Sequence, residues 1–153
     1  MPMITDFEYN DIRGPIEQAC HELNMERPPI ELVGSARILG EGNDIDVALF
    51  VTNEELRERI LELARIDGWN MQGAGYEPIV AGNNFTSIKK GIYNLLICAD
   101  QVSWDRFTVG ARLCVFLQGL GVPVEDKRVR VAIHALAGGE GEEGVLKSVR
   151  RVG

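Results

Sequence analysis

Four short stretches of the chain have the hydrophobic pattern of β-strands. They are rich in apolar residues and are bounded by Gly, Pro or polar residues, which commonly end a strand. We predict strands over residues 30–33, 44–51, 85–90 and 92–98, of which the last two are either separate strands or one strand bent at Lys90-Gly91. The segment 69–82 is rich in Gly and polar residues, and we expect a strand with an irregular return there. In the second strand Asp44, Asp46 and Ala48 would share a face, because side chains two residues apart project to the same side.

Four further stretches carry apolar residues at the three-to-four-residue spacing of an amphipathic helix. The predicted helices cover residues 11–24, 52–67, 103–120 and 125–137. We expect the first to begin near Pro15, because proline fits the first turn of a helix. Thr52 and Glu55 have the spacing of a capping box, and Ser103 is a candidate N-cap for the third helix.

The third predicted helix, residues 103–120, is apolar on almost every side. Its apolar residues are Trp104, Phe107, Val109, Ala111, Leu113, Cys114, Phe116, Leu117 and Leu120. Such a helix is either largely buried, or covers the sheet on one side and a neighbouring helix or subunit on the other. A homo-oligomer is therefore one open interpretation of the chain.

Length and composition indicate a single globular domain of 153 residues, with a flexible C-terminal tail from about residue 138. The formal net charge of −7 argues against tight, non-specific nucleic-acid binding by the whole surface, although a local basic patch stays open. No apolar run approaches the about 20 residues of a membrane span, and residues 1–10 lack a signal-peptide pattern. Cys20, Cys98 and Cys114 are widely spaced among apolar residues. We therefore expect a cytoplasmic protein with buried thiols and no membrane partner.

The most informative polar residues lie in and around the second strand. Asp44 and Asp46 would project side by side, and two adjacent carboxylates repel each other unless a cation neutralises them. Oxygen ligands at this spacing suit Mg²⁺, which takes one or two carboxylates and completes its shell with substrate phosphates. The preceding Gly34-Ser35 turn could offer backbone N–H groups and a hydroxyl to those phosphates.

Several cations are candidates for the same phosphates. Arg37 either reaches the phosphate held by the Gly34-Ser35 turn or is a solvated surface cation. Lys89 and Lys90 are either edge-strand charges, which protect against strand pairing, or triphosphate ligands. Lys127, Arg130 and His134 form one helical stripe, for which a solvent-facing position is favoured over a nucleotide or RNA contact.

Together these residues carry a resemblance to a known family. An apolar strand ending in VGS, the spacer ARILGEGN and then DID followed by VALFV resembles the motif of the nucleotidyltransferase superfamily, the DNA polymerase beta-like enzymes and their minimal relatives. The later segments FTSIKKGIYNLLICAD and WDRFTVGARLCVFLQGLGV are similar to those of small phage-encoded members. The resemblance covers residues 30–136.

The resemblance implies an α+β (mixed α/β) fold, with helices packed on a mixed sheet of about four to six strands. It also implies a reaction that transfers a nucleoside monophosphate from an NTP to a hydroxyl and releases pyrophosphate. Gly34 and Ser35 would bind phosphate, and Asp44 and Asp46 would bind Mg²⁺ or Mn²⁺. If the protein is phage-encoded, it would act in the host cytoplasm. The acceptor stays open between protein, RNA and a small molecule.

The chain departs from the family pattern at the third carboxylate, which active members carry on a following strand. The best positional match is Asn94, whose amide cannot serve as a general base. Asp100 is six residues further on, about 20 Å along a strand, and Glu77 is an unaligned alternative. Two functions therefore stay open: a nucleotidyltransferase, and a weakened relative that binds a nucleotide or a host protein as a regulator.

Overall fold

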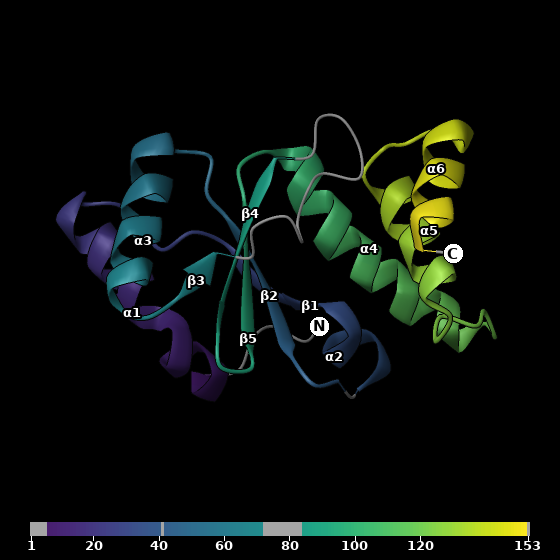
Figure 1. Cartoon of the computed structure of the whole chain (residues 1–153), viewed down its shortest axis with the longest axis horizontal. Helices are drawn as coiled ribbons and strands as arrows, with labels where there is room; N and C mark the ends of the chain where they lie inside the picture. Colours follow the sequence, from purple (N-terminus) through teal and green to yellow (C-terminus); the bar gives the residue numbers. More distant parts are fainter. Residues whose placement is uncertain (1–5, 41, 72–83, 153) are drawn as a thin grey trace.

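We analysed a computed structural model of the chain, which describes residues 6–40, 42–71 and 84–152. Within these residues, five strands form one mixed sheet in the order β1-β2-β5-β4-β3 (Figure 1). Their bounds are Ile30–Val33 (β1), Ile45–Phe50 (β2), Asn70–Met71 (β3), Phe85–Lys90 (β4) and Tyr93–Cys98 (β5). The neighbours β2 and β5 run parallel, and the other pairs run antiparallel. The predicted α+β class, with a mixed sheet of four to six strands, is confirmed.

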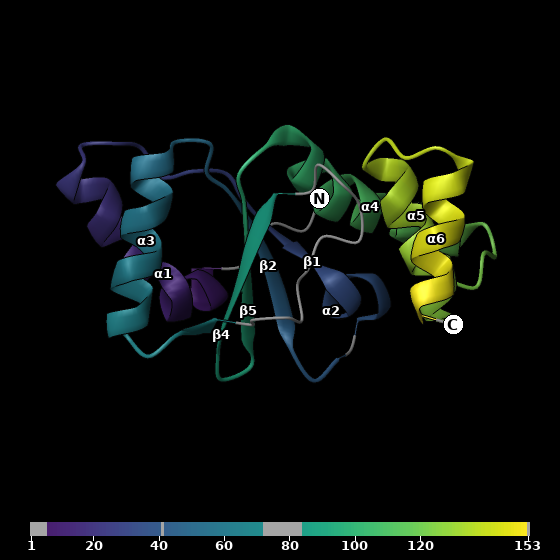
Figure 2. The same ribbon diagram turned by 45° about the horizontal axis from the view of Figure 1, so that its top comes forward.

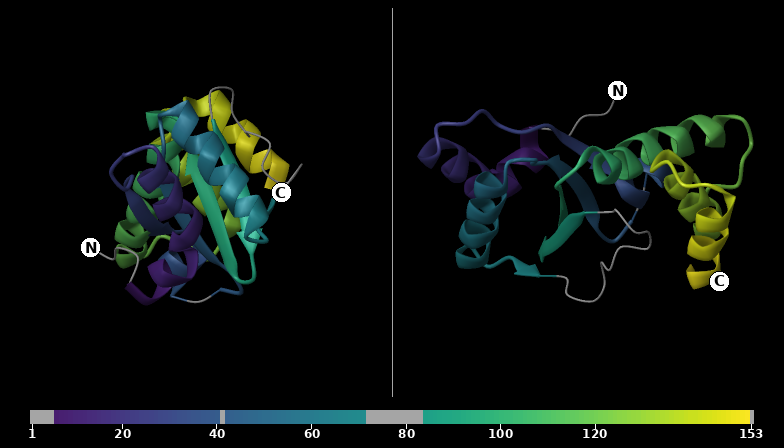
Figure 3. Two further views of the ribbon diagram at one scale, coloured as in Figure 1. Left: turned by 90° about the vertical axis from the view of Figure 1, so that its left-hand side faces the viewer. Right: turned by 90° about the horizontal axis from the view of Figure 1, so that it is seen from above.

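Helices cover both faces of this sheet. Their bounds are Asp6–Glu22 (α1), Gly34–Leu39 (α2), Glu54–Ile66 (α3), Gln101–Gly119 (α4), Lys127–Ala137 (α5) and Glu142–Val152 (α6). The pair α1 and α3 lies on one face, and α2 and α4 lie on the other, as Figures 2 and 3 show. Helix α5 packs on α4, and α6 packs on α5, so that these last two helices lie farther from the sheet than α4.

The hydrophobic core divides into two clusters, one on each face of the sheet. Leu49 lies in the cluster under α1 and α3, together with Ile12 and Ile60. Ala48 lies in the cluster under α2, α4 and α5, together with Cys114. The alternation predicted for the second strand is therefore confirmed, and it places the Asp46 side of β2 on the α4 face.

Helix α1 begins earlier than the sequence predicted. It starts at Asp6 and contains Pro15 in its interior, although we expected the helix to begin there. Proline removes one helical hydrogen bond, but the buried stripe continues on both sides of it, from Ile12 to Ile16 and Ala19. Packing of this stripe against the sheet therefore outweighs the local cost of the proline.

Two helix caps also differ from the prediction. Asn53 caps α3 in place of the predicted Thr52, through a 2.9 Å hydrogen bond that its side chain accepts. Asp100 caps α4 by accepting a 2.9 Å bond from the Ser103 N–H. The Ser103 side chain is instead buried and accepts a 2.6 Å bond from the Asn84 N–H. Each cap lies within three residues of the predicted one, because several good capping residues are neighbours in the sequence.

The sequence did not predict the last helix of the structure. Residues 142–152, expected to belong to a flexible tail, form helix α6 with Ser148 buried. Acidic residues in the first turn of α6 and basic residues in its last turn complement the helix dipole. Helix α5 begins at Lys127, two residues later than predicted, because the Asp126 side chain caps it.

Helix α4 has one buried side and one exposed side. Ala111 and Cys114 are fully buried, whereas Phe116 and Leu120 are 63% and 67% exposed. The prediction of buried thiols is confirmed for all three cysteines. Of the described helices, none is both long and apolar enough to cross a lipid bilayer.

Gly14 offers a test of this description of α1. It lies in the helix interior, and beyond its chain neighbours and the helix's own backbone a Cβ atom there would meet nothing within 4 Å. Gly14→Ala should therefore change the free energy of unfolding by about 0.5 kcal/mol or less. Alanine loses less backbone entropy on folding, but Pro15 disfavours a helical residue with a Cβ before it. Urea denaturation followed by circular dichroism measures the change.

Gly110→Ala is the matched control for Gly14→Ala. Its Cβ would lie 2.7 Å from Cδ2 of His134, so this second glycine-to-alanine change in a helix should destabilise the protein. A loss of stability in Gly14→Ala as large as that in Gly110→Ala would contradict a helix that runs through residue 14.

Candidate functional site

Three polar side chains form a row across the middle of the sheet. Asp46 of β2 is in register with Asn94 of β5, and Asn94 is in register with Lys89 of β4. Directly opposed residues project to the same face of a sheet, so the three side chains lie side by side on the α4 face. The register thus brings together a carboxylate, an amide and a cation from strands far apart in the sequence.

Two members of this row, Asn94 and Lys89, bind directly to the acidic pair of Asp46 and Asp44. Asn94 Nδ2 donates a 2.9 Å hydrogen bond to Asp46 Oδ1, which satisfies the amide that the sequence placed in an apolar strand. Lys89 Nζ lies 3.1 Å from both carboxylate oxygens of Asp44, the residue before β2. Lys90 instead pairs with Asp67 at 3.2 Å, at the end of α3. Of the two lysines considered as phosphate ligands, Lys89 therefore lies at the acidic pair of Asp44 and Asp46, whereas Lys90 lies elsewhere.

Gly34 and Ser35 form the start of α2, and Gly34 lies directly against Asp46. Gly34 has φ +75°, a conformation that favours glycine, and a Cβ there would lie 2.1 Å from Asp46 Oδ2. On the other side of the turn, a Cβ on Gly42 would lie 2.9 Å from Ser35 Oγ. Two glycines therefore allow the turn, the loop and the Asp46 carboxylate to pack together.

The environment of Asp46 disfavours its charged form. Burial raises the pKa of the Asp46 carboxyl above its ordinary value, and the neighbouring Asp44 charge raises it further. The hydrogen bond from Asn94 and the Lys89 charge act in the opposite direction and are the smaller effects in sum. Asp46 is consequently a carboxylate that gains from an additional cation.

Arg37 does not belong to this group. Its side chain is buried, lies 3.7 Å from a Glu31 oxygen and donates a 3.4 Å hydrogen bond to the Leu32 carbonyl. Arg112 of α4 also binds Glu31. A buried carboxylate such as Glu31 needs cationic partners, and this ion pair holds Arg37 inside the fold. Arg37 is therefore not placed to contact a phosphate at Gly34 and Ser35.

A cavity of about 440 Å³ opens beside Asp46 and Ser35. Its far wall comes from α4 and α5 and is formed by Arg106, Phe107, Lys127, Arg130, Val131 and His134. The predicted stripe of Lys127, Arg130 and His134 therefore lines this cavity, although the sequence favoured a position facing open solvent. The three-to-four-residue spacing could identify the stripe, but not the element that it faces.

Hydrogen bonds and ion pairs hold the basic wall in place. Arg130 Nη1 donates to the carbonyls of Val124 and Glu125 at 2.9 and 3.0 Å. Arg106 lies 3.8 Å from a Glu140 oxygen. The cavity thus combines the Asp46 carboxyl on the sheet with a basic wall on the helices.

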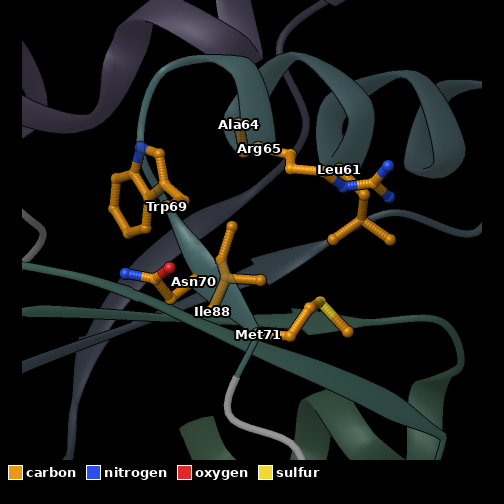
Figure 4. Close-up of a pocket in the computed structure, with 7 residues that line it drawn as sticks. All are labelled: Leu61, Ala64, Arg65, Trp69, Asn70, Met71 and Ile88. Carbon is orange, nitrogen blue, oxygen red and sulfur yellow. The ribbon is translucent and has the colours of Figure 1, made fainter.

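A second cavity, of about 260 Å³, lies on the opposite face of the sheet. Figure 4 shows its lining by Leu61, Ala64, Arg65, Trp69, Asn70, Met71 and Ile88. It is mainly apolar and none of the candidate site residues lines it. We assign no chemistry to it.

The acidic pair is the donor set available for a metal. Over residues 6–40, 42–71 and 84–152, no three or more His, Cys, Asp or Glu side chains are grouped so that they could hold a metal ion. Asp100 accepts the capping bonds of α4 and is engaged there. Glu77, the other acid considered from the sequence, lies outside the described residues.

We compared the chain with protein-family models and with curated proteins. No protein-family model matches the chain, and no curated protein matches it significantly. Membership of the nucleotidyltransferase superfamily therefore stays a prediction from the motif residues.

Removing the charge of Asp46 should stabilise the metal-free protein. Because the pKa of Asp46 is raised in the folded state, ionisation opposes folding: stability falls as pH rises from the ordinary aspartate pKa of about 3.9 through the raised value. Asp46→Asn keeps an oxygen for the Asn94 bond, so we expect a gain of about 0.5–2 kcal/mol at pH 7. Urea denaturation at several pH values measures it.

Asp44→Asn is the control for this comparison. It removes the ion pair with Lys89, so we expect no comparable gain. If Asp46→Asn were less stable than the wild type at pH 7 without metal, the described electrostatics of Asp46 would be wrong.

Proposed function

We propose that the protein is a metal-dependent nucleotidyltransferase, which binds an NTP beside Asp44 and Asp46 and transfers its nucleoside monophosphate to an acceptor hydroxyl. Pyrophosphate is the second product. One observation carries the proposal: Ser35 and Asp46, the latter packed against Gly34, face a basic wall across a single cavity. Its volume of about 440 Å³ lies in the usual range of small-molecule sites.

The donor chemistry fits Mg²⁺ or Mn²⁺. Asp44 and Asp46 supply carboxylate oxygens, and an NTP supplies the remaining negatively charged oxygens that such an ion prefers. When bound, the ion neutralises phosphate charge and aligns the attacking and leaving oxygens. The raised pKa of Asp46 supports this assignment, because a cation is what this carboxyl lacks.

The chain's own residues position the triphosphate. Gly34 and Ser35 offer their turn to the phosphates at the sheet edge. Lys127 and Arg130 line the opposite wall and neutralise phosphate oxygens from that side. Lys89 holds Asp44 in place and balances its charge before the substrate binds.

One observation favours a second function, that of a nucleotide-binding regulator without turnover. Asn94 lies directly beside Asp46, where the resemblance leads us to expect a third carboxylate, and its amide donates a hydrogen bond to Asp46. An amide cannot remove a proton from an acceptor hydroxyl. A host protein would be the partner of such a regulator.

Both functions belong in the cytoplasm, or in the host cytoplasm for a phage-encoded protein. Nucleoside triphosphates are available there, and the reducing conditions suit three free, buried cysteines. The acceptor in the enzymatic function is a protein, an RNA or a small molecule.

Metal-dependent nucleotide binding is the first test. Titration calorimetry with each of the four common NTPs in the presence of Mg²⁺ should detect binding by the wild type. Asp44→Asn combined with Asp46→Asn should weaken it by about tenfold or more, because the metal loses its protein ligands. Asp67→Asn is the matched control, since Asp67 pairs with Lys90 much as Asp44 pairs with Lys89. Equal affinity in the wild type and the double variant would refute the proposed site.

Turnover separates the two functions. With labelled NTPs, Mg²⁺ or Mn²⁺ and candidate acceptors, the enzyme should release pyrophosphate faster than the Asp44→Asn/Asp46→Asn variant. A wild type that binds NTP but does not transfer it, and that gains activity on Asn94→Asp, would instead identify the regulator.

A further inference from the structure

One polar group on the basic wall of the cavity is not a cation. His134 lines the cavity from α5, and its Nδ1 lies 2.7 Å from the Arg130 carbonyl oxygen one turn earlier. A carbonyl oxygen only accepts, so Nδ1 carries the proton. In the neutral ring, Nε2 then carries a lone pair, and it makes no hydrogen bond within the described part of the chain.

The position of this ring is fixed by packing. A Cβ on Gly110 of α4 would lie 2.7 Å from His134 Cδ2 and 2.9 Å from Cγ, so the ring occupies the space that glycine leaves between the two helices. The contact with Gly110 and the bond to Arg130 hold two sides of the imidazole. Nε2, at the far edge of the ring, is the polar atom that His134 can present to the cavity.

The surroundings keep the ring neutral. Burial lowers the pKa of His134 below its ordinary value, and the nearby charges of Arg106 and Arg130 lower it further. The bond to the Arg130 carbonyl acts in the opposite direction and is the smaller effect. The other charged groups of the cavity are Lys127 on α5 and Asp46 across it on β2, while Glu140 pairs with Arg106.

A neutral imidazole of this tautomer suits a particular kind of ligand. Its Nε2 lone pair repels a phosphate oxygen, which also only accepts, whereas it accepts a hydrogen bond from a hydroxyl. His134 and Asp46 line one cavity, so a hydroxyl bound at Nε2 would share that cavity with the proposed metal–phosphate site.

We propose that His134 Nε2 is the proton acceptor for the attacking hydroxyl and that the cavity between β2 and α5 seats the acceptor molecule. The inference rests on the proposed nucleotidyltransferase function. The hydroxyl oxygen forms a bond to the α-phosphorus, and the bond from that phosphorus to the α–β bridging oxygen breaks. Pyrophosphate leaves with the electron pair, and the hydroxyl proton moves to Nε2. The imidazolium then releases the proton to solvent.

This assignment supplies the base that the sheet lacks. Asn94 of β5 lies beside Asp46 of β2 and cannot accept the proton. His134 instead lines the Asp46 cavity from α5. Proton removal therefore moves from the sheet to a helix that is packed on α4.

Nuclear magnetic resonance tests the tautomer without any turnover. The chain has two histidines, so His21, which is exposed on α1, serves as an internal reference. Long-range proton–nitrogen spectra should show His134 protonated at Nδ1 and neutral at pH 7. An Nε2-protonated or charged His134 would overturn the proposal.

Kinetics test the role itself. In the pyrophosphate-release assay, the wild-type rate should rise with pH through the pKa of His134 and then level off. His134→Gln should keep NTP affinity within about twofold. Its transfer rate should fall by about 10²–10⁴-fold and should no longer rise with pH.

Added imidazole should partly restore transfer in His134→Ala, which leaves space beside Gly110. His21→Gln is the matched control and should behave as the wild type.

The outcomes distinguish this inference from the proposed function. Absence of Mg²⁺-dependent NTP binding would overturn the function, and the inference would fall with it. NTP binding without transfer by the wild type would overturn both the transferase function and the inference. Transfer by His134→Gln at the wild-type rate and pH profile would overturn the inference alone. In either of these cases the nucleotide site itself would stand.

Discussion

The pairing of β2 with β5 is the constraint on which the candidate site depends. Their parallel register places Asp46 beside Asn94, and the antiparallel pairing of β5 with β4 extends the row to Lys89. A shift of one residue would turn Asp46 into the cluster under α1 and α3, where an ionised carboxyl would lack these partners. The apolar residues of β2 prevent that shift, because Ala48 and Leu49 each fit the packing of one face only.

The site concentrates negative charge that the fold only partly neutralises. Lys89 balances Asp44, and Asn94 supports Asp46, yet burial and mutual repulsion still raise the pKa of Asp46. Gly34 allows the turn to approach this carboxyl so closely that no other residue would fit. Carboxyl groups with perturbed pKa values cluster at functional sites, which agrees with the cation site that we propose.

The wall opposite the acidic pair depends on the packing of α4 and α5. Gly110 lets these helices approach around His134, and Asp126 starts α5 at the position that turns Lys127 toward the cavity. The buried pair of Arg37 with Glu31 ties α2 to β1. The sheet side with Asp46 and the basic wall are therefore held by separate contacts, and the cavity is the space between them.

The sequence alone determined most of the secondary structure and the acidic half of the site. Two-residue and four-residue periodicities predicted the strands and most of the helices, because they report which residues must be buried. The Gly34-Ser35 turn and the Asp44–Asp46 pair were recognisable from local spacing. The turn and the acidic pair lie close together because β1 and β2 are joined by a short connection and form an antiparallel pair.

Tertiary structure decided what the distant residues do. It placed Arg37 in a buried ion pair, joined Lys89 but not Lys90 to the acidic pair, and turned the stripe of Lys127, Arg130 and His134 toward Asp46. It also packed residues 142–152 against α5 as helix α6, which the sequence had not predicted. Spacing shows which residues share a face of a helix, but only the packing of that helix decides what the face meets.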